Sequence, residues 1–195
     1  MCSGRVDLEF VLRAFSNGMD GVFIGGCRLN ECNYITHGNY DALNMALLCK
    51  RIMEHIGLNP ERLKIDFMSS AEGVVFAEVM SKFGDKVTKL GPLGNAERID
   101  QRELKSKLAE IMSLIPYIKL VKSVKLASRL KNPEEYDKLF TKEEIDKLFS
   151  EVVSYYIDPE KCQACMTCAK RCPVEAILSG KNLIHIVDQE KCIKC

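Results

Sequence analysis

Apolar and polar positions along residues 1–94 follow three helical patterns separated by two short apolar runs. The helical patterns have apolar residues at helical spacing and each ends at a glycine: residues 7–18, residues 40–57 and the stretch from Ser69 to Gly84. The two runs have the length of buried strands: GVFIGG at 21–26 and LKIDFM at 63–68. This alternation predicts an α/β fold with a parallel sheet and crossover helices.

The third helical pattern has a start signal of its own. Ser69 is followed three residues later by Glu72, which is the spacing of a capping box. We therefore expect a helix to begin close to these residues and to present one apolar stripe, formed by Phe76, Val79, Met80 and Phe83.

Residues 95–153 combine much charge with few turn signals. Residues 97–115 have a helical pattern that Pro116 interrupts, and residues 117–130 continue it. Two later stretches, NPEEYDKLF and TKEEIDKLFSEVV, have the signals of capped helices. Because the apolar stripes look weak, we expect a helical connector with few contacts to residues 1–94 apart from its first helix.

Basic residues gather near one edge of this predicted connector: Lys119, Lys122, Lys125 and Arg129. Such a row is usually a solvated face, and the alternative is a docking surface for an acidic partner protein.

The end of the chain contains an internal repeat. IDPEKCQAC (157–165) and VDQEKCIKC (187–195) align at an offset of 30 residues and share Asp, Glu, Lys and both cysteines. The first copy continues as a C-x2-C-x2-C-x3-C-P run, which is typical of bacterial ferredoxins. We expect a small α+β ferredoxin-like unit over 154–195 that is incomplete at its C-terminal end.

The repeat predicts how two [4Fe–4S] clusters divide the cysteines. The fourth cysteine of such a run ligates the other cluster. The first cluster would use Cys162, Cys165 and Cys168, and the second would use Cys172, Cys192 and Cys195. A zinc site is the alternative, because C-x2-C pairs also bind zinc.

Three further cysteines lie near the predicted parallel sheet. Cys2 precedes the first helix, Cys27 follows the first strand, and Cys32 closes the loop CRLNEC. Strand carboxyl ends share one edge of a parallel sheet, so these thiols are expected to meet there and to share a metal site. Three unrelated cysteines are the alternative, since C-x4-C is a weak signal. Cys49 lies on the apolar stripe of its helix and is expected in the core.

Composition narrows the class of protein. The 195 residues are 47% apolar and 28% charged with a net charge of +1, which describes a globular protein without a global attraction to nucleic acid. No apolar stretch approaches the length of about eighteen residues that a membrane span needs. The grouping of six of the ten cysteines within 162–195 favours metal binding in a reducing cytosol over disulfides. The sequence has neither a GxGxxG motif nor a P-loop.

Four segments resemble one protein family: MCSGRVDLEFVLRAF, GMDGVFIGGC, ECNYITHGNY and SSAEGVVFAEVMSKFGDKVTKLGPLG. Together they are similar to the delta (iron–sulfur) subunit of methyl-viologen-reducing hydrogenase. The resemblance implies a cytoplasmic subunit that passes electrons between a hydrogenase or formate dehydrogenase and heterodisulfide reductase, with a heterodisulfide reductase-type A-subunit as partner. It also implies a [2Fe–2S] cluster with Cys2, Cys27 and Cys32 as candidate ligands. The family has a strand and a C-x2-C pair upstream of MCSGR, so residues 1–94 are expected to be incomplete at the N-terminal end.

The leading functional hypothesis is therefore an electron-relay subunit without a catalytic centre of its own. Two alternatives remain at the level of sequence. One is a thiol oxidoreductase that uses Cys27 and Cys32 as a dithiol, although C-x4-C is not the usual redox spacing. The other is a zinc-binding scaffold without redox function.

Overall fold

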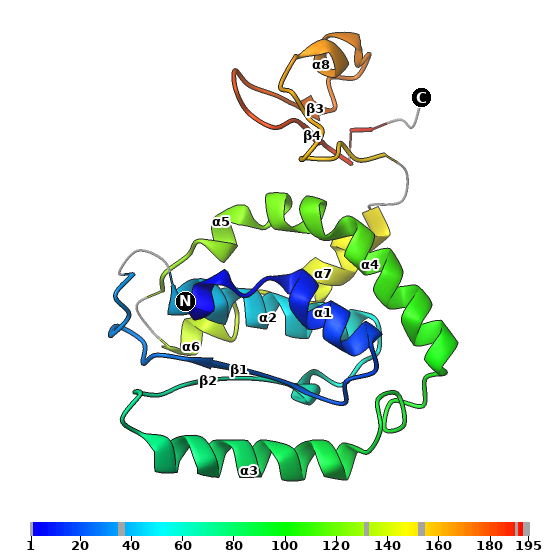
Figure 1. Ribbon diagram of the computed structural model, residues 1–195. Coiled ribbons are helices and arrows are strands. Elements are labelled where there is room, and N and C mark those ends of the chain that lie inside the picture. Colours follow the sequence, from blue (N-terminus) through cyan, green and yellow to red (C-terminus); the bar gives the residue numbers. More distant parts are fainter. Residues whose placement is uncertain (1, 35–37, 131–132, 152–154, 190, 193–195) are drawn as a thin grey trace.

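The computed structural model describes residues 2–34, 38–130, 133–151, 155–189 and 191–192. They form a mixed fold of helices with one small parallel sheet and one small antiparallel sheet. Figure 1 shows a larger body, built from the helices and the parallel sheet, and a smaller C-terminal module beyond one end of it. Within the described residues, no helix is long and apolar enough to cross a membrane.

The parallel sheet is a β–α–β unit. Strand β1 (Val22–Gly26) pairs in parallel with β2 (Leu63–Phe67), and helix α2 (Asn39–His55) connects them through the short 3₁₀ helix η2 (Pro60–Arg62). The register runs from Val22 opposite Leu63 to Gly26 opposite Phe67, so both carboxyl ends reach the same edge. The predicted parallel pairing is confirmed.

Helix α1 (Leu8–Ser16) packs beside α2 on one face of this sheet (Figure 1). Its start is set by Asp7, whose side chain accepts a hydrogen bond from the Glu9 N–H at 3.0 Å. A short 3₁₀ helix η1 (Ser3–Arg5) precedes α1 and contacts α2 and β1. The packing of η1 thereby holds Cys2 close to the edge where β1 ends.

Helix α3 (Gly73–Leu90) covers the opposite face of the sheet (Figure 1). It is attached by aromatic contacts, with the Phe23 ring centroid 6.3 Å from that of Phe76 and 5.9 Å from that of Phe83. The predicted end at Gly84 is wrong: the helix runs through this glycine and ends at Gly91, where φ is +68°. An internal glycine costs only about 1 kcal/mol, and the contacts of Phe76 and Phe83 with Phe23 help to offset that cost.

Helix α4 (Gln101–Val121) lies along α1 and is continuous through Pro116. Its buried aliphatic residues repeat at intervals of four and three: Leu104, Leu108, Ile111, Ile115 and Ile118. They join the buried residues of α1 and α2 in one hydrophobic core that extends from Leu8 to Leu148. The expected interruption at Pro116 is therefore wrong.

Three shorter helices complete the larger body: α5 (Ser123–Leu126), α6 (Pro133–Tyr136) and α7 (Lys142–Glu151). Residues 95–151 are mainly helical, as predicted, but the expectation of few contacts to residues 1–94 is wrong. Asn44 on α2 donates to the carbonyls of Leu126 and Ser128, and Arg51 on α2 donates to the Phe140 carbonyl. The many charged residues of this segment made its apolar stripe look weak, but the stripe on α4 is long enough to share one core with residues 1–94.

The four basic residues of this row make contacts within the molecule, although Lys119 and Arg129 are exposed and Lys122 alone of the four is buried. Lys122 is 9% exposed and, with Lys125, forms ion pairs with Glu144 of α7. Lys119 pairs with Asp7 at the start of α1, and Arg129 lies over the Tyr40 ring. These contacts join the later helices to residues 1–94.

A buried ion pair closes the base of the sheet. Arg62 is fully buried and donates to the Glu97 carboxylate and to four backbone carbonyls, which belong to Asp20, Leu90, Gly91 and Pro92. Burial acts to raise the pKa of Glu97, but the hydrogen bonds from Arg62 and from backbone N–H groups outweigh it and lower that pKa.

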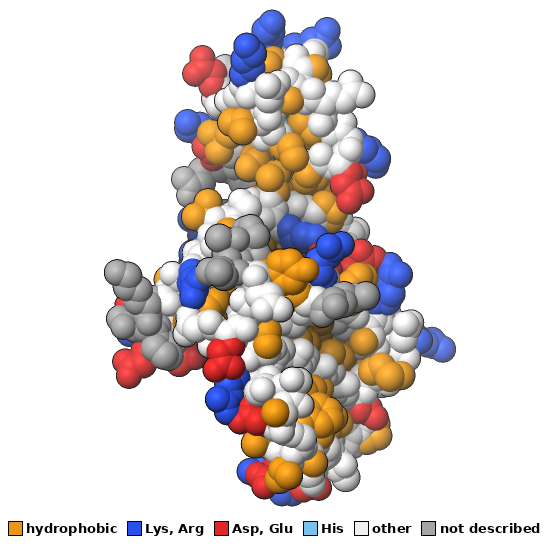
Figure 2. All heavy atoms as spheres, turned by 60° about the vertical axis from the view of Figure 1, so that its left-hand side comes forward, with side chains coloured by type: hydrophobic (Ala, Val, Ile, Leu, Met, Phe, Trp, Pro, Cys, Tyr) orange, Lys and Arg blue, Asp and Glu red, His pale blue; other side chains and the backbone are white. Residues whose placement is uncertain are grey.

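The C-terminal module contains helix α8 (Thr167–Arg171) and the antiparallel strands β3 (Ile177–Leu178) and β4 (Ile186–Val187). In Figure 2 it forms the narrow upper part of the molecule, with Lys and Arg side chains at its outer end and apolar side chains nearer the larger body. Tyr156 connects the two parts through a ring contact with Tyr117 of α4, with centroids 6.1 Å apart.

Candidate cysteine sites

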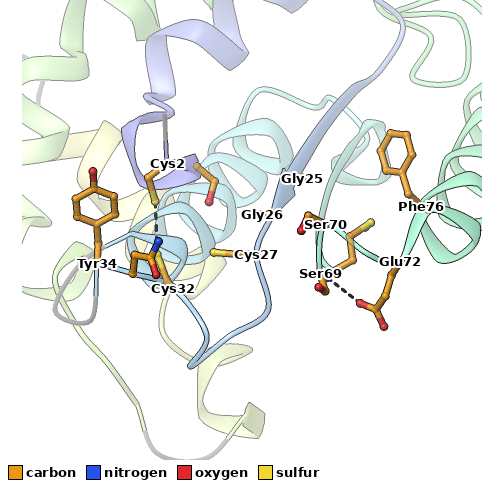
Figure 3. A pocket seen from close by; sticks show the side chains of 14 residues that line it. Cys2, Gly25, Gly26, Cys27, Cys32, Tyr34, Ser69, Ser70, Glu72 and Phe76 are labelled. Carbon is orange, nitrogen blue, oxygen red and sulfur yellow. Dashed lines mark hydrogen bonds between the residues drawn. The ribbon is translucent and has the colours of Figure 1, made fainter.

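Cys2, Cys27 and Cys32 line one open hollow of about 690 Å³ at the carboxyl edge of the parallel sheet (Figure 3). The sulfur atoms of Cys2 and Cys32 are 3.7 Å apart. The sequence prediction that these three thiols share one edge of the sheet is confirmed, whereas their binding of a metal is a separate question.

The chain brings the three thiols together from different elements. Cys27 directly follows β1, Cys32 lies in the loop between β1 and α2, and Cys2 immediately precedes η1. On the opposite side of the hollow lie Ser69 and Ser70, which follow β2, and Phe76 of α3.

Gly38 allows the thiol pair to approach the start of α2. This residue has a φ of +88°, and a Cβ atom added to it would lie 2.6 Å from Cys32 Sγ and 3.2 Å from Cys2 Sγ. Any side chain here would combine an unfavourable backbone conformation with a clash against sulfur. The site therefore requires glycine at position 38.

Backbone N–H groups face Cys32. Hydrogen bonds from the Tyr34 N–H and, more weakly, from the Asn39 N–H at the start of α2 lower the pKa of the Cys32 thiol. Burial, together with the hydrogen bond and negative charge of Cys32, raises the pKa of Cys27. Of these two thiols, Cys32 is thus the one more readily held as a thiolate.

Asn39 fixes the loop that carries Cys27. Its side chain is 1% exposed, and its Nδ2 atom donates to the carbonyls of Cys27 at 2.9 Å and Arg28 at 2.7 Å. The same nitrogen is 3.7 Å from Cys27 Sγ. Sequence reasoning missed both Asn39 and Gly38, and the available signal was the Gly-Asn pair directly before an apolar helical pattern.

An ion pair spans the side of the hollow formed by α3. Arg28 pairs with Glu72, whose carboxylate also accepts the Ser69 N–H at 2.7 Å. These hydrogen bonds, from the Ser69 backbone first and then from Arg28, lower the pKa of Glu72. The predicted capping box is half formed, because Glu72 caps Ser69 while the helix itself begins at Gly73.

The two copies of the C-terminal repeat have matching local structures. The Cys162 N–H donates to the Asp158 carbonyl at 3.0 Å, and the Cys192 N–H donates to the Asp188 carbonyl at the same distance. An Asp–Lys ion pair accompanies each turn, from Asp158 to Lys161 and from Asp188 to Lys191. The sixth cysteine of the predicted set, Cys195, lies outside the described residues.

Three sulfur atoms of the C-x2-C-x2-C-x3-C run have distinct environments. Hydrogen bonding with Thr167 lowers the pKa of Cys165, and the Ala176 N–H donates to Cys172 Sγ at 3.2 Å. Cys168 Sγ lies 3.1 Å from Nδ1 of His185. Sequence reasoning assigned no role to His185, which is 1% exposed.

Across the described part of the chain, no group of three or more Cys, His, Asp or Glu side chains is already closed around one metal position. Cys49 is fully buried, and burial raises the pKa of its thiol to about 12, so its predicted place in the core is confirmed. His37 lies outside the described residues.

Comparison with known proteins identifies both parts of the chain. Residues 1–91 match the family described as methyl-viologen-reducing hydrogenase, delta subunit, and residues 155–178 match the 4Fe-4S binding domain. Over 91 residues the chain is 46% identical to the iron-sulfur D-subunit of the F420-non-reducing hydrogenase of Archaeoglobus profundus, covering 47% of this chain and 66% of that protein. Over 104 residues it is 36% identical to the iron-sulfur D-subunit of the F420-non-reducing hydrogenase vhc of Methanococcus voltae, covering 52% of this chain and 72% of that protein. The chain belongs to the hydrogenase delta-subunit family.

A third relative places a similar segment within a much longer protein. The chain is 44% identical over 95 residues to the A-subunit of the Ferredoxin/F(420)H(2)-dependent CoB-CoM heterodisulfide reductase of Methanosarcina acetivorans. This match covers 49% of the chain but 12% of that protein. The chain thus spans 66% of the Archaeoglobus relative and a small part of the Methanosarcina one.

Proposed function

We propose that the protein is an electron-transfer subunit that carries iron–sulfur clusters and relays electrons between a hydrogenase or formate dehydrogenase and a heterodisulfide reductase-type complex. The observation that carries this proposal is the presence of two cysteine sites in one chain. One lies in the region of the hydrogenase delta-subunit family and the other in a 4Fe-4S binding domain. It performs no bond chemistry by itself.

The C-terminal cysteines suit a pair of [4Fe–4S] clusters. We assign Cys162, Cys165 and Cys168 to the first cluster and Cys172, Cys192 and Cys195 to the second. The matching turns before Cys162 and Cys192 support this division, because they present the leading cysteine of each copy in the same way. The Ala176 N–H that donates to Cys172 Sγ is the kind of contact that stabilises a ligating thiolate. This ferredoxin-type unit is assigned to residues 154–195.

The N-terminal thiols suit part of a third cluster, for which we propose the [2Fe–2S] type. Cys2, Cys27 and Cys32 line one hollow. Because residue 38 is a glycine, no side chain occupies the space beside the sulfur atoms of Cys2 and Cys32. N–H groups of Tyr34 and Asn39 favour the thiolate form of Cys32, which is the form that binds iron. These three thiols account for three of the four ligands that such a cluster takes.

A bound cluster supplies the one-electron redox step, and the chain sets where and at what potential this step occurs. Each added electron makes the site more negative. The N–H groups at the start of α2 then stabilise that charge at the N-terminal site, because they carry the positive end of the helix dipole. Asn39 keeps the Cys27 loop in one position, so little structural reorganisation accompanies electron transfer.

The proposed partners follow from the relatives. A segment similar to this one is part of the Methanosarcina heterodisulfide reductase A-subunit. The Archaeoglobus and Methanococcus relatives are named as hydrogenase subunits. These names support a heterodisulfide reductase-type A-subunit as one partner and a hydrogenase as the other. A formate dehydrogenase in place of the hydrogenase is proposed from the family resemblance of the sequence alone.

Serine variants at the two sites, compared with a serine variant in the core, test the proposal. Protein purified without oxygen is analysed for iron, for acid-labile sulfide and for visible absorption. Cys165→Ser should lose iron from the C-terminal module, and Cys27→Ser should lose iron from the other site. Cys49→Ser controls for the loss of a thiol alone and should retain the iron content of the parent. A colourless parent protein that contains zinc or free thiols would instead support a scaffold or a dithiol oxidoreductase.

A further inference from the structure

His185 is a buried histidine beside a cysteine of the first proposed cluster. It immediately precedes β4 and has an exposed fraction of 1%. Its Nδ1 atom lies 3.1 Å from Cys168 Sγ, which is the distance of a hydrogen bond to sulfur. Its Nε2 atom is also buried and has no hydrogen-bond partner within the described ranges of the chain.

The direction of this hydrogen bond depends on whether Cys168 carries a proton. A free thiol could donate to the imidazole, but a cysteine that binds iron has lost its proton. In the cluster-bound protein, only the Nδ1–H group of His185 can then supply the hydrogen. Burial of the ring holds this donor in place, because the side chain has no route to solvent.

We propose that His185 is a positioning residue that donates its Nδ1–H group to Cys168 Sγ and raises the reduction potential of the first cluster. This inference rests on the proposed cluster-binding function. Hydrogen bonds to ligating sulfur stabilise the reduced cluster more than the oxidised one, because the reduced cluster is more negative.

The internal repeat makes the effect specific to one cluster. At the offset of 30 residues, the counterpart of His185 is Tyr155, which is 57% exposed. The first copy of the repeat thus has no buried imidazole at the equivalent position. The two clusters should therefore differ in potential, with the first one at the higher value.

Redox titration of the full-length, anaerobically purified protein tests the inference, with each reduced cluster followed by EPR. His185→Leu removes the donor, while His185→Asn keeps an amide N–H near the position of Nδ1. His185→Gln keeps a buried amide but moves it one bond further from the backbone. Tyr155→Leu is the matched control at the other copy of the repeat.

We expect the Leu and Gln variants to lower the potential of one cluster by roughly a tenfold change in its reduction equilibrium, equivalent to about 59 mV for one electron. The Asn variant should restore most of this shift, and Tyr155→Leu should leave that cluster unchanged. Iron-loaded Leu and Gln variants with unchanged potentials would overturn the role of His185 alone. Equal shifts of the reduction potential in all three His185 variants would also overturn the role of His185 as a donor, because a role in packing alone predicts equal shifts. A parent protein without clusters would overturn the proposed function and this inference together.

Discussion

The sulfur atoms of Cys2 and Cys32 lie 3.7 Å apart although thirty residues separate them in the chain. The contact depends on Gly38, whose backbone passes directly beside both sulfurs. The backbone of Gly38 therefore contributes to the shape of the hollow at the sheet edge as much as the thiols do.

Gly38→Ala should reduce the iron content at the N-terminal site. The added methyl group would lie 2.6 Å from Cys32 Sγ, and the positive φ adds a conformational cost of about 1–3 kcal/mol. Gly18→Ala is a matched control, because Gly18 has a similar φ of +87° but open space around it. Iron analysis and urea denaturation of both variants separate the two effects. If the two variants retain the same iron content, Gly38 has no special relation to the cysteine site.

Asn39→Ala should lower both the stability and the iron content of the protein. It leaves the carbonyls of Cys27 and Arg28 without their buried donor, at a cost of about 1–3 kcal/mol. Asn44→Ala on the same helix removes a comparable pair of hydrogen bonds, to Leu126 and Ser128, away from the cysteines. We expect a similar loss of stability in both variants and a loss of iron in Asn39→Ala alone. Equal iron content in the two would contradict the role given to Asn39.

The cysteine site illustrates what sequence can and cannot predict here. Strand order and the positions of Cys27 and Cys32 were enough to predict which edge of the sheet the thiols share. The support for that edge comes from Gly38 and Asn39, whose roles depend on the path of the loop between β1 and α2. No periodic pattern encodes such a path, so the Gly-Asn pair before the helix marks a helix start in the sequence but does not reveal which groups the two residues contact.

Glu97→Gln should destabilise the protein by about 3 kcal/mol at neutral pH, because it leaves the buried Arg62 guanidinium without its counter-ion. The pKa of Glu97 is lowered in the folded protein from its ordinary value of 4.5. Its contribution is thus fully present above pH 4.5 and is lost as the pH falls through the lower, folded-state pKa. Urea denaturation at a series of pH values should show the two proteins converging in stability at acid pH. A constant difference down to the lowest pH would contradict this account of the ion pair.

Leu108→Ala should destabilise the whole larger body by about 2–5 kcal/mol, since Leu108 is fully buried in the shared core. Lys105→Ala on the exposed side of the same helix should change stability by less than about 0.5 kcal/mol. Alkylation of the buried Cys49 on α2, followed by peptide mass spectrometry, reports opening of the core. Leu108→Ala should increase the alkylation rate. An unchanged rate would contradict a core shared between α4 and α2.

The helices after residue 95 show why the expectation of few contacts to residues 1–94 was wrong. Charged residues are frequent in this segment, but the residues that decide the packing of α4 are the few apolar ones at intervals of four and three. Pro116 also misled, because it lies where the helix continues without a break. The spacing of the apolar residues predicts this helix better than the single proline does. That spacing is easily overlooked, because the surface against which the apolar face packs is not visible in the sequence of the helix itself.

The visible absorption spectrum of the full-length protein, purified without oxygen and measured before and after reduction with dithionite, tests the central claim most directly. An iron–sulfur relay predicts brown protein with broad thiolate-to-iron absorption that bleaches on reduction, accompanied by matching amounts of iron and acid-labile sulfide. Colourless protein, with zinc or free thiols in place of iron, would contradict the account.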